Sequence, residues 1–330
     1  MMADTSGATL VEKKGDSPKK PDKKTKYDVI IIGAGPAGYT AGIYSARAGW
    51  ETLLLSGILP GGQLVNTTDV ENYPGFEKGI MGPDLMIEMR KQTERMGTTI
   101  VDDEAINVDF KHKPFKVLTS SDEFEGRAVI VATGASPRTL GLEGEKTFGG
   151  KGLSYCATCD GPFFKNQELI VVGGGDSAME EGTFLTKFAS KVHIIHRRDK
   201  LRASQIMQER AFENPKIEFH WNSELKEIKG NEKVQEVVIS NNQKNEDTTM
   251  KVGGVFVAIG HIPNTKLFEN QLEMDENGYI VLKEKMQTSI EGVYAAGDAH
   301  DHRYRQAVTA AGFGCMAAIE VDKYLTERGN

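Results

Sequence analysis

The sequence predicts an α/β fold in which one unit, a strand, a glycine turn, a helix and a second strand, occurs twice along 330 residues. The first unit starts with the apolar run at residues 27–32, which is followed by the glycine-rich segment 33–38. The second starts at residues 168–172 and is followed by the segment 173–178. Neither run alternates apolar with polar residues, as is typical of strands in a parallel sheet that is covered on both faces.

The elements after each glycine turn follow in the same order. The helical patterns and the second short apolar runs are predicted at residues 36–48 and 177–189, and at 52–55 and 191–195. Further along, each unit contains a buried strand that ends at a glycine, at residues 129–134 and 255–260. We therefore expect two nucleotide folds of related design.

The composition argues against several classes of protein. A formal net charge of −7 is opposite to the basic surplus of a nucleic-acid-binding domain. Three cysteines do not suit a small secreted disulfide scaffold, so we expect a reducing, cytoplasmic location. No apolar run approaches the length of a membrane span. Residues 1–26 lack the apolar centre of a signal peptide and are expected to form a disordered extension, with a weak lysine-rich contact surface as the alternative.

Both glycine segments are predicted to bind dinucleotides. A Gly-x-Gly-x-x-Gly/Ala turn between a strand and a helix lets the backbone approach a pyrophosphate, while the helix presents free N–H groups and its positive dipole end to the anionic oxygens. One such match is weak evidence, whereas two matches in this context are much stronger. The alternative is that these glycines serve only helix–strand packing. The pattern favours two Rossmann-like dinucleotide-binding domains.

The residues after the second strand of each unit distinguish the two ligands. In the second unit this strand ends at His196, Arg197 and Arg198, and Arg202 follows one turn later. Guanidinium groups suit the 2′-phosphate of NADPH, whereas an acid at this place is usual for NAD. A solvated basic face is the alternative. In the first unit the strand ends at Ser56 without an acid, so this loop alone does not identify its ligand.

Cys156 and Cys159 form a Cys-x-x-Cys pair ahead of the second glycine loop. This spacing permits a disulfide in which one thiol attacks and the other resolves. Zinc is the main rival, but it needs about two more ligands, and the chain offers only Cys315 and scattered histidines. Two inert buried thiols are a further alternative. Asp160 is expected to move a proton during thiol exchange, or else to serve the turn before Gly161.

Taken together, these sites predict a flavin enzyme. A nicotinamide releases two electrons as a hydride, whereas thiol exchange needs them at one sulfur, and a flavin connects the two chemistries. We therefore expect FAD at the first loop, NADPH at the second and a dithiol exit to a partner protein. Because the cysteines directly precede the second loop, disulfide and nicotinamide belong to one domain, which we expect to rotate about hinges near residues 141–145 and 261–265.

An ordered set of short motifs runs over nearly all of residues 27–325. They are Gly33-Ala-Gly-Pro-Ala-Gly38, Gly61-Gly-Gln-Leu64, Glu71-Asn-Tyr-Pro-Gly75, Ala132-Thr-Gly134, Cys156-Ala-Thr-Cys-Asp160, Gly173-Gly-Gly-Asp-Ser-Ala178, His196-Arg-Arg-Asp199, Ala258-Ile-Gly-His-Ile-Pro-Asn264, Ala296-Gly-Asp298 and Arg305-Gln-Ala307. In this set the sequence resembles the low-molecular-weight, bacterial and archaeal-type thioredoxin reductases, a branch of the class II pyridine nucleotide-disulfide oxidoreductases.

The resemblance implies a thioredoxin-disulfide reductase in which a hydride passes from NADPH to FAD, and electrons then pass to the Cys156–Cys159 disulfide and to oxidised thioredoxin. Cys159 would face the flavin, and Cys156 would attack the disulfide of the partner. The FAD contacts expected are Gly33, Ala34, Gly35, Pro36, Ala37, Gly38, Gly62, Gln63, Asn72, Ala132, Gly297, Asp298, Arg305, Gln306 and Ala307, with Ser56 added from its place at the strand end. The NADPH contacts expected are Gly175, Asp176, Ser177, His196, Arg197, Arg198, Arg202, Ile259 and Gly260.

The resemblance also implies a homodimer, and we expect no nucleic-acid or membrane partner. It divides the chain into a discontinuous FAD-binding domain at residues 27–140 and 265–330, and an NADPH-binding domain with the cysteine pair at residues 141–264. The extension at residues 1–26 departs from the pattern of the family, and the sequence assigns it no role.

Two alternatives to this function stay open. One is a related flavin reductase that serves a peroxiredoxin-type or other thiol partner; ferredoxin-linked relatives lack the cysteine pair, which counts against them. The other is a non-catalytic NADPH or redox sensor, in which NADPH would not bleach the bound flavin within seconds.

Overall fold

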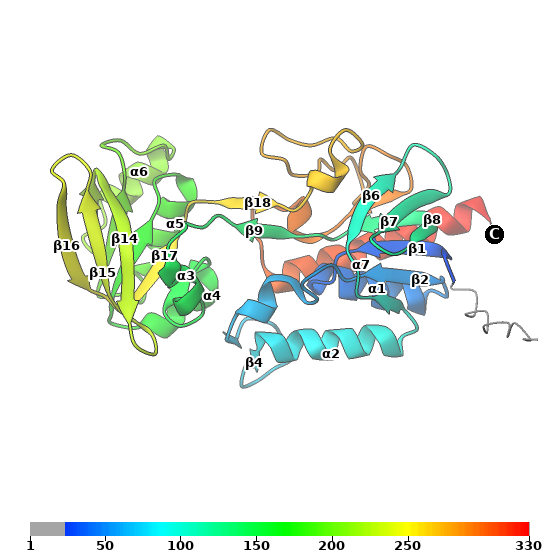
Figure 1. The fold of residues 1–330 in the computed structure, drawn as a ribbon, viewed down its shortest axis with the longest axis horizontal. Coiled ribbons are helices and arrows are strands. Elements are labelled where there is room, and N and C mark those ends of the chain that lie inside the picture. Colours follow the sequence, from blue (N-terminus) through cyan, green and yellow to red (C-terminus); the bar gives the residue numbers. More distant parts are fainter. Residues whose placement is uncertain (1–23, 330) are drawn as a thin grey trace, which may run out of the picture.

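One sheet is built from the first unit and the end of the chain (Figure 1). The computed structural model describes residues 24–329. In spatial order the strands are β5 (Thr99–Val101), β2 (Thr52–Leu55), β1 (Lys26–Ile32), β8 (Glu123–Val131), β7 (Phe115–Thr119) and β6 (Ala105–Asp109), with β19 (Val293–Ala295) against the end of β8. The strands β5, β2, β1, β8 and β19 are parallel, whereas β7 and β6 extend the sheet in antiparallel pairing.

Both faces of this sheet are covered, as its continuous apolar strands require. One face packs against the helices α1 (Pro36–Arg47), α2 (Gly82–Arg95) and α7 (Ala307–Arg328). The other face is covered by apolar side chains that include Phe110, Phe115 and Phe268. The small ribbon of β3 (Asp69–Val70) and β4 (Ile80–Met81) precedes α2. We call this part of the molecule the first lobe.

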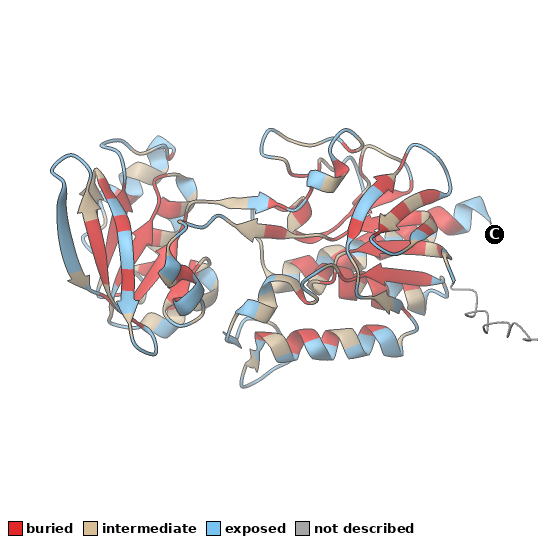
Figure 2. Cartoon of the chain, viewed as in Figure 1, coloured by how far each residue is buried: buried red, intermediate tan, exposed pale blue. Residues whose placement is uncertain are grey.

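The second lobe contains a parallel sheet in the order β10 (Leu153–Ser154), β17 (Gly254–Val257), β11 (Glu168–Val172), β12 (Lys191–His196) and β13 (Ile217–Trp221). The helices α5 (Asp176–Leu185) and α6 (Gln205–Phe212) pack on one face. An antiparallel sheet of β14 (Ser223–Gly230), β15 (Val234–Asn241) and β16 (Glu246–Lys251) packs on the other. The short helices α3 (Glu143–Phe148) and α4 (Ala157–Asp160) precede β11. Figure 2 shows the buried residues concentrated in the central strands of both lobes.

The two lobes are joined by two chain segments that pair with each other. The outgoing segment is β9 (Ala135–Pro137) and the returning segment is β18 (His261–Pro263), and they form an antiparallel ribbon (Figure 1). The side chain of Asn264 closes one end of the ribbon, since it donates to the carbonyl of Thr133 at 3.0 Å. The chain therefore leaves the first lobe once and returns once.

The predicted α/β fold is confirmed, with differences at the ends of elements. The buried strand expected at residues 129–134 is β8, which starts at Glu123 because its first half pairs with β7 in a hairpin that the sequence pattern did not reveal. It ends at Val131, so residues 132–134 form the turn after it. Helix α5 ends at Leu185, four residues before its expected end. Of the extension expected at residues 1–26, residues 1–23 lie outside the described residues, and β1 begins at Lys26. No helix in the described part of the chain combines the length and apolar character that a membrane crossing requires.

Candidate active site

A cavity of about 1000 Å³ lies at the junction of the two lobes. The first glycine loop, the turn after β8 and the beginning of α7 line it from the first lobe. Cys156, Cys159 and Asp160 line it from the second lobe. Of the expected FAD contacts, fifteen of the sixteen line this cavity, namely Gly33, Ala34, Gly35, Pro36, Ala37, Ser56, Gly62, Gln63, Asn72, Ala132, Gly297, Asp298, Arg305, Gln306 and Ala307.

Gly38, the remaining expected contact, has a packing position instead. A Cβ atom on Gly38 would lie 1.9 Å from the carbonyl oxygen of Gly33, so only glycine lets α1 approach the end of β1 this closely. Gly33 itself has a φ of +111° and faces the backbone of Ala132. In contrast, a Cβ on Gly35 would meet no atom of residues 24–329 within 4 Å, which leaves the start of α1 open to the cavity. The loop thus presents the free N–H groups of α1 to the space where an anion would bind.

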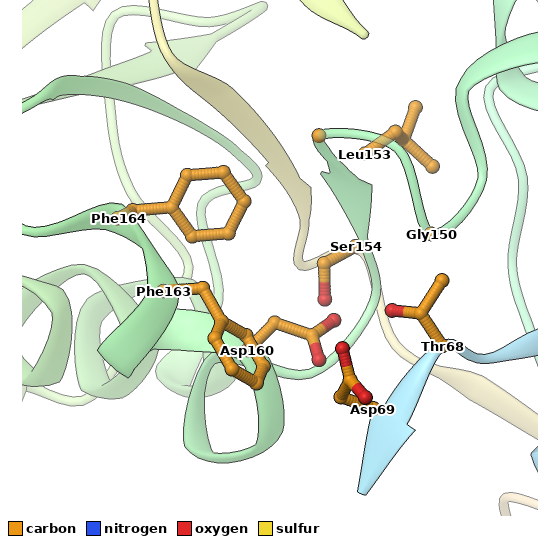
Figure 3. A pocket seen from close by; sticks show the side chains of 9 residues that line it. Thr68, Asp69, Gly150, Leu153, Ser154, Asp160, Phe163 and Phe164 are labelled. Carbon is orange, nitrogen blue, oxygen red and sulfur yellow. The ribbon is translucent and has the colours of Figure 1, made fainter. Parts of the chain in front are cut away.

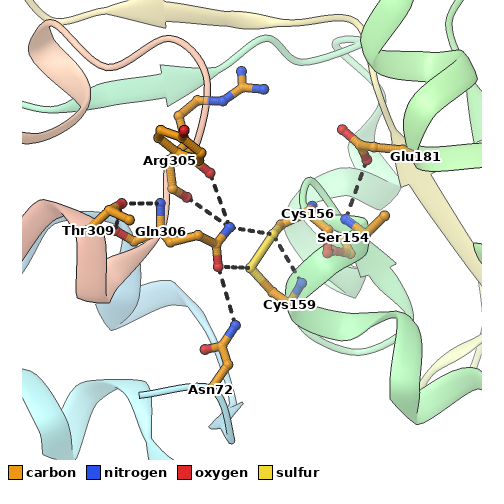
Figure 4. The surroundings of a disulfide bond; sticks show 10 residues. Asn72, Ser154, Cys156, Cys159, Glu181, Arg305, Gln306 and Thr309 are labelled. Atoms are coloured by element: carbon orange, nitrogen blue, oxygen red, sulfur yellow. Dashed lines mark hydrogen bonds between the residues drawn. A yellow bond between two sulfur atoms is a disulfide. The ribbon is translucent and has the colours of Figure 1, made fainter. Parts of the chain in front are cut away.

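The cysteine pair forms a disulfide at the wall of this cavity (Figure 4). Cys156 precedes α4, and its sulfur accepts the N–H of Cys159 at 3.2 Å. Gln306 reaches the pair from the start of α7, with its Nε2 atom 3.8 Å from Cys156 Sγ and its Oε1 atom 4.0 Å from Cys159 Sγ. Asn72 donates to the same Oε1 atom at 3.3 Å and so holds Gln306 in place. The disulfide of the second lobe therefore contacts the site of the first glycine loop.

Asp160 lies beside the disulfide and also lines a smaller pocket of about 140 Å³ between the lobes. The side chains of Thr68 and Asp69 from the first lobe and of Ser154 and Asp160 from the second point toward one another around this pocket (Figure 3). Burial raises the pKa of the Asp160 carboxyl, and a hydrogen bond from Ser154 opposes the shift. Asp160 therefore keeps its proton to a higher pH than an exposed aspartate does.

Two further carboxyls near the site are partly withdrawn from solvent. Burial raises the pKa of Glu181 to about 7, and the N–H of Ala157, the residue after Cys156, approaches its Oε2 atom at 3.4 Å. Glu181 was not among the expected site residues, although its spacing from the buried Ala178 and Leu185 places it on the same side of α5. Burial and the neighbouring Asp301 raise the pKa of Asp298 to about 7.

The return segment is tied to the site by an Arg–His contact. Arg305 has a φ of +49°, and its Nη1 atom lies 2.6 Å from Nδ1 of His261 in β18. Burial, together with the charge of Arg305, lowers the pKa of His261 to about 4. The imidazole is therefore neutral at physiological pH and able to accept from the guanidinium. The contact links the ribbon between the lobes to the loop before α7.

The second glycine loop lies outside the large cavity, and none of the nine expected NADPH contacts lines it. The loop is held to the segment after β12, where the N–H of Arg202 donates to the carbonyl of Gly174 at 2.7 Å. Ser204 donates through its backbone and its hydroxyl to Asp176 at 2.7 and 2.9 Å. Arg197, Arg198 and Arg202 are exposed around it. The structure thus brings the expected pyrophosphate loop and the guanidinium groups to one surface.

His196 takes a different position from its arginine neighbours. Its ring is 6 % exposed and lies against the backbone of Gly174, where a Cβ atom would meet it at 2.2 Å. Its Nε2 atom is 2.9 Å from the carbonyl oxygen of Lys200. The side chain therefore supports the shape of the loop.

Acidic side chains lie near the end of β2, although none follows that strand directly in the sequence. Ser56 donates to Asp102 at 2.8 Å, and Arg90 binds the same carboxylate through two nitrogens at 2.7 and 2.9 Å. The hydrogen bond from Arg90 holds the pKa of Asp102 below its usual range. Glu104, from the segment between β5 and β6, also lines the cavity here. The acids near this strand end come from the segment between β5 and β6, which is why the pattern after the first glycine loop did not show them.

This arrangement defines an oxidoreductase of two lobes, each with a dinucleotide-type glycine loop, in which a redox disulfide faces one of the two loops. A family model described as pyridine nucleotide-disulphide oxidoreductase matches residues 27–314. The chain belongs to the pyridine nucleotide-disulphide oxidoreductase family, and this membership implies a flavin and a pyridine nucleotide.

The individual proteins that this chain is similar to include several thioredoxin reductases. A thioredoxin reductase of Rickettsia bellii is 54 % identical over 304 residues, which cover 91 % of this chain and 98 % of that protein. A thioredoxin reductase of Streptomyces clavuligerus is 51 % identical over 302 residues, which cover 90 % of this chain and 94 % of that protein. Among solved structures, the thioredoxin reductase of Streptococcus pyogenes has a TM-score of 0.89 at 43 % identity, covering 92 % of this chain and all of that one. The predicted resemblance to thioredoxin reductases is confirmed.

Proposed function

We propose that this chain reduces the disulfide of thioredoxin with electrons from NADPH, by way of FAD and the Cys156–Cys159 pair. The observation that carries this proposal is the position of that pair. Its disulfide lines the cavity of the first glycine loop and contacts Gln306 at the start of α7. The sequence relatives named thioredoxin reductase support the choice of thioredoxin as the partner.

The cavity fits a dinucleotide flavin. Its volume of about 1000 Å³ is at the upper end of the ~300–1,000 Å³ range of small-molecule sites. The open side of Gly35 provides close access to the backbone N–H groups of α1 for a pyrophosphate. We assign the fifteen expected contacts that line the cavity to FAD, which when bound accepts a hydride from a nicotinamide and reduces a disulfide. In this proposal Gly38 acts through packing.

We assign the second glycine loop, with Arg197, Arg198 and Arg202, to NADPH. Replacing both Arg197 and Arg198 by Ala is expected to lower kcat/KM for NADPH by about 10²-fold, because each charge-assisted hydrogen bond to the 2′-phosphate contributes roughly 1.5–3 kcal/mol. The value for NADH is expected to change less than about threefold. Arg210→Ala, at an exposed position of the same lobe, is the matched control. An equal loss with both nicotinamides would contradict the assignment.

Asp160 is assigned as the group that exchanges a proton with the thiols. Because burial raises its pKa, Asp160 keeps a proton to a higher pH than an exposed aspartate does, and it loses the ability to supply that proton as the pH rises through its pKa. The Asp160→Asn variant is expected to reduce thioredoxin about 10²-fold more slowly. Thioredoxin reduction by the variant should no longer slow down toward high pH as it does in the wild type. The reduction of the flavin by NADPH is expected to stay unchanged. A pH profile of the wild-type shape in Asp160→Asn would exclude this role.

We further propose that the NADPH-binding domain, residues 141–264, rotates against the FAD-binding domain, residues 27–140 and 265–330. The second glycine loop lies outside the cavity that the disulfide lines, so one arrangement does not serve both half-reactions. A thioredoxin reductase of Lactococcus lactis in what is named the FR conformation supports movement. It is 46 % identical over 91 % of this chain and 99 % of that one, yet the TM-score between the two structures is only 0.62. A chain this similar with a low TM-score differs in the arrangement of its parts.

An apolar stripe supports a homodimer. Val308, Met316 and Ile319 are 41–49 % exposed on one face of α7, and Tyr44 of α1, which packs against α7, is 44 % exposed. Exposed apolar side chains at helical spacing are typical of an interface. Sedimentation equilibrium is expected to give twice the chain mass of 36.2 kDa. A single-chain mass at micromolar concentration would rule out this dimer.

The proposed function is tested by two successive measurements on one preparation of the enzyme. Under anaerobic conditions NADPH is expected to bleach the flavin within seconds, faster than NADH does, and the reduced enzyme should then reduce a thioredoxin. Bleaching without thioredoxin reduction would point to another thiol partner. Binding of flavin without bleaching would identify a sensor.

A further inference from the structure

The second lobe contains two histidines and a glutamate whose ligand atoms converge. Among residues 24–329, His193, Glu218 and His220 form the group of metal-ligating side chains whose ligand atoms all lie within 4.8 Å of one another. Nδ1 of His193 is 3.0 Å from Nε2 of His220, and that Nε2 atom is 3.4 Å from Oε1 of Glu218. None of these residues lines the large cavity, and the proposed reaction does not use them.

The strand register brings the three residues together. In the parallel pairing of β12 with β13, His193 is the partner of Glu218, and His220 follows two residues later on the same face. Directly opposite and diagonal positions of neighbouring strands are within reach of long side chains. Three ligands on two adjacent strands therefore require no unusual backbone conformation.

A carboxylate fixes the imidazole of His193 in the orientation that a metal needs. Oε2 of Glu168, on the neighbouring strand β11, lies 3.1 Å from Nε2 of His193. With its Nε2 proton donated to Glu168, a neutral His193 directs the lone pair of Nδ1 toward His220 and Glu218. A carboxylate that orients a ligating histidine in this way is a common part of metal sites. The side chain of His193 is 4 % exposed, so its ring is also held by packing.

The distances suit a small tetrahedral ion. With zinc–nitrogen and zinc–oxygen bonds of about 2.0–2.2 Å, neighbouring ligand atoms in a tetrahedral site lie about 3.3 Å apart. The observed separations of 3.0 and 3.4 Å are close to that value. Lys191 pairs with Oε2 of Glu218, which leaves Oε1 on the side of the histidines. Glu218 and His220 are 45 % and 24 % exposed, so an ion and a water as fourth ligand have access from solvent.

We propose that His193, Glu218 and His220 bind a divalent transition metal, with zinc as the natural ion. Imidazole and carboxylate ligands suit zinc and its neighbours in the series better than they suit calcium or magnesium. Because β13 is the edge strand of its sheet, the ion stabilises the second lobe by joining β13 to β12. The site is independent of the proposed thioredoxin reduction.

The test measures metal binding directly, on tag-free protein with the Cys156–Cys159 disulfide oxidised and with Cys315→Ser, so that thiols do not bind the metal. After equilibrium dialysis, one zinc per chain is expected, and cobalt should give the intense visible bands of a tetrahedral site. Zinc should also raise the Tm of the protein.

Three variants locate the ligands, and one serves as a control. His220→Ala and Glu218→Gln change partly exposed side chains and are expected to abolish the cobalt spectrum. Glu168→Gln is expected to weaken binding about 10–100-fold, as loss of an orienting carboxylate does. His112→Ala, which removes an exposed histidine paired with Asp109 at 2.9 Å, should bind as the wild type does. The proposal is overturned if the wild type binds no zinc, or if His220→Ala and Glu218→Gln bind it unchanged.

Discussion

Replacing Cys159 by Ser is expected to lower the rate of thioredoxin reduction by at least about 10³-fold while NADPH still bleaches the flavin. The bond between Cys156 and Cys159 is the disulfide that lines the cavity of the first glycine loop. Without the second sulfur no internal disulfide forms, so electrons reach the flavin but not the partner protein. Stopped-flow absorbance with NADPH, followed by an assay of thioredoxin thiols, measures the two half-reactions separately.

Two further variants complete this experiment. Cys315→Ser removes the free cysteine of α7, away from the cavity, and should leave both half-reactions unchanged. Cys156→Ser distinguishes the two sulfurs, since a Cys159 thiolate next to the flavin should produce a long-wavelength absorbance band that Cys159→Ser lacks. Thioredoxin reduction by Cys159→Ser above a tenth of the wild-type rate would falsify the assigned route.

Fixing the two lobes in the arrangement seen here is expected to slow the reduction of the flavin by NADPH at least about 10²-fold. Thr68 in the first lobe and Gly150 in the second meet across the lobe junction, where a Cβ on Gly150 would lie 3.4 Å from Cγ2 of Thr68. Cysteines at these two positions, in a Cys315→Ser background, can be joined by a short thiol-bridging reagent such as dibromobimane. The reaction is done on oxidised enzyme, in which Cys156 and Cys159 are protected as a disulfide.

The single variants Thr68→Cys and Gly150→Cys, treated with the same reagent, are the controls. Gly150 has a φ of +71°, so a side chain there costs about 1–3 kcal/mol, and the single variant measures that cost separately. Both singles should bleach at the wild-type rate. Wild-type bleaching in the bridged protein would show that NADPH reaches the flavin without movement of the lobes.

Features that depend on neighbours in the chain were predictable from sequence. The glycine turns, the helices after them and the cysteine motif are each specified within about twenty residues. The strands β2 and β12 were placed almost to the residue for this reason. The start of β8 at Glu123 was missed because it depends on pairing with β7, and pairing is not visible in a local pattern.

Contacts between distant segments were not predictable in this way. Gln306 was expected to bind FAD, but its contact with Cys156, 150 residues away, appears only once the lobes are assembled. Glu181 and Glu104 were missed because the contact of Glu181 with Ala157 and the position of Glu104 at the end of β2 depend on tertiary packing. The histidine and glutamate cluster depends on the register between β12 and β13, which no spacing in the sequence specifies.

The ribbon of β9 and β18 has a mechanical consequence. A single connecting segment would allow one lobe to rotate relative to the other about any axis. Two crossings that are hydrogen-bonded to each other are expected to resist separation and sliding, so that twist about their common long axis is the movement they oppose least. In the rotation proposed above, the paired segments are therefore expected to favour twist about one axis over free movement about three. We expect the stiffness of residues 135–137 and 261–263 to set the rate of the proposed rotation of the lobes.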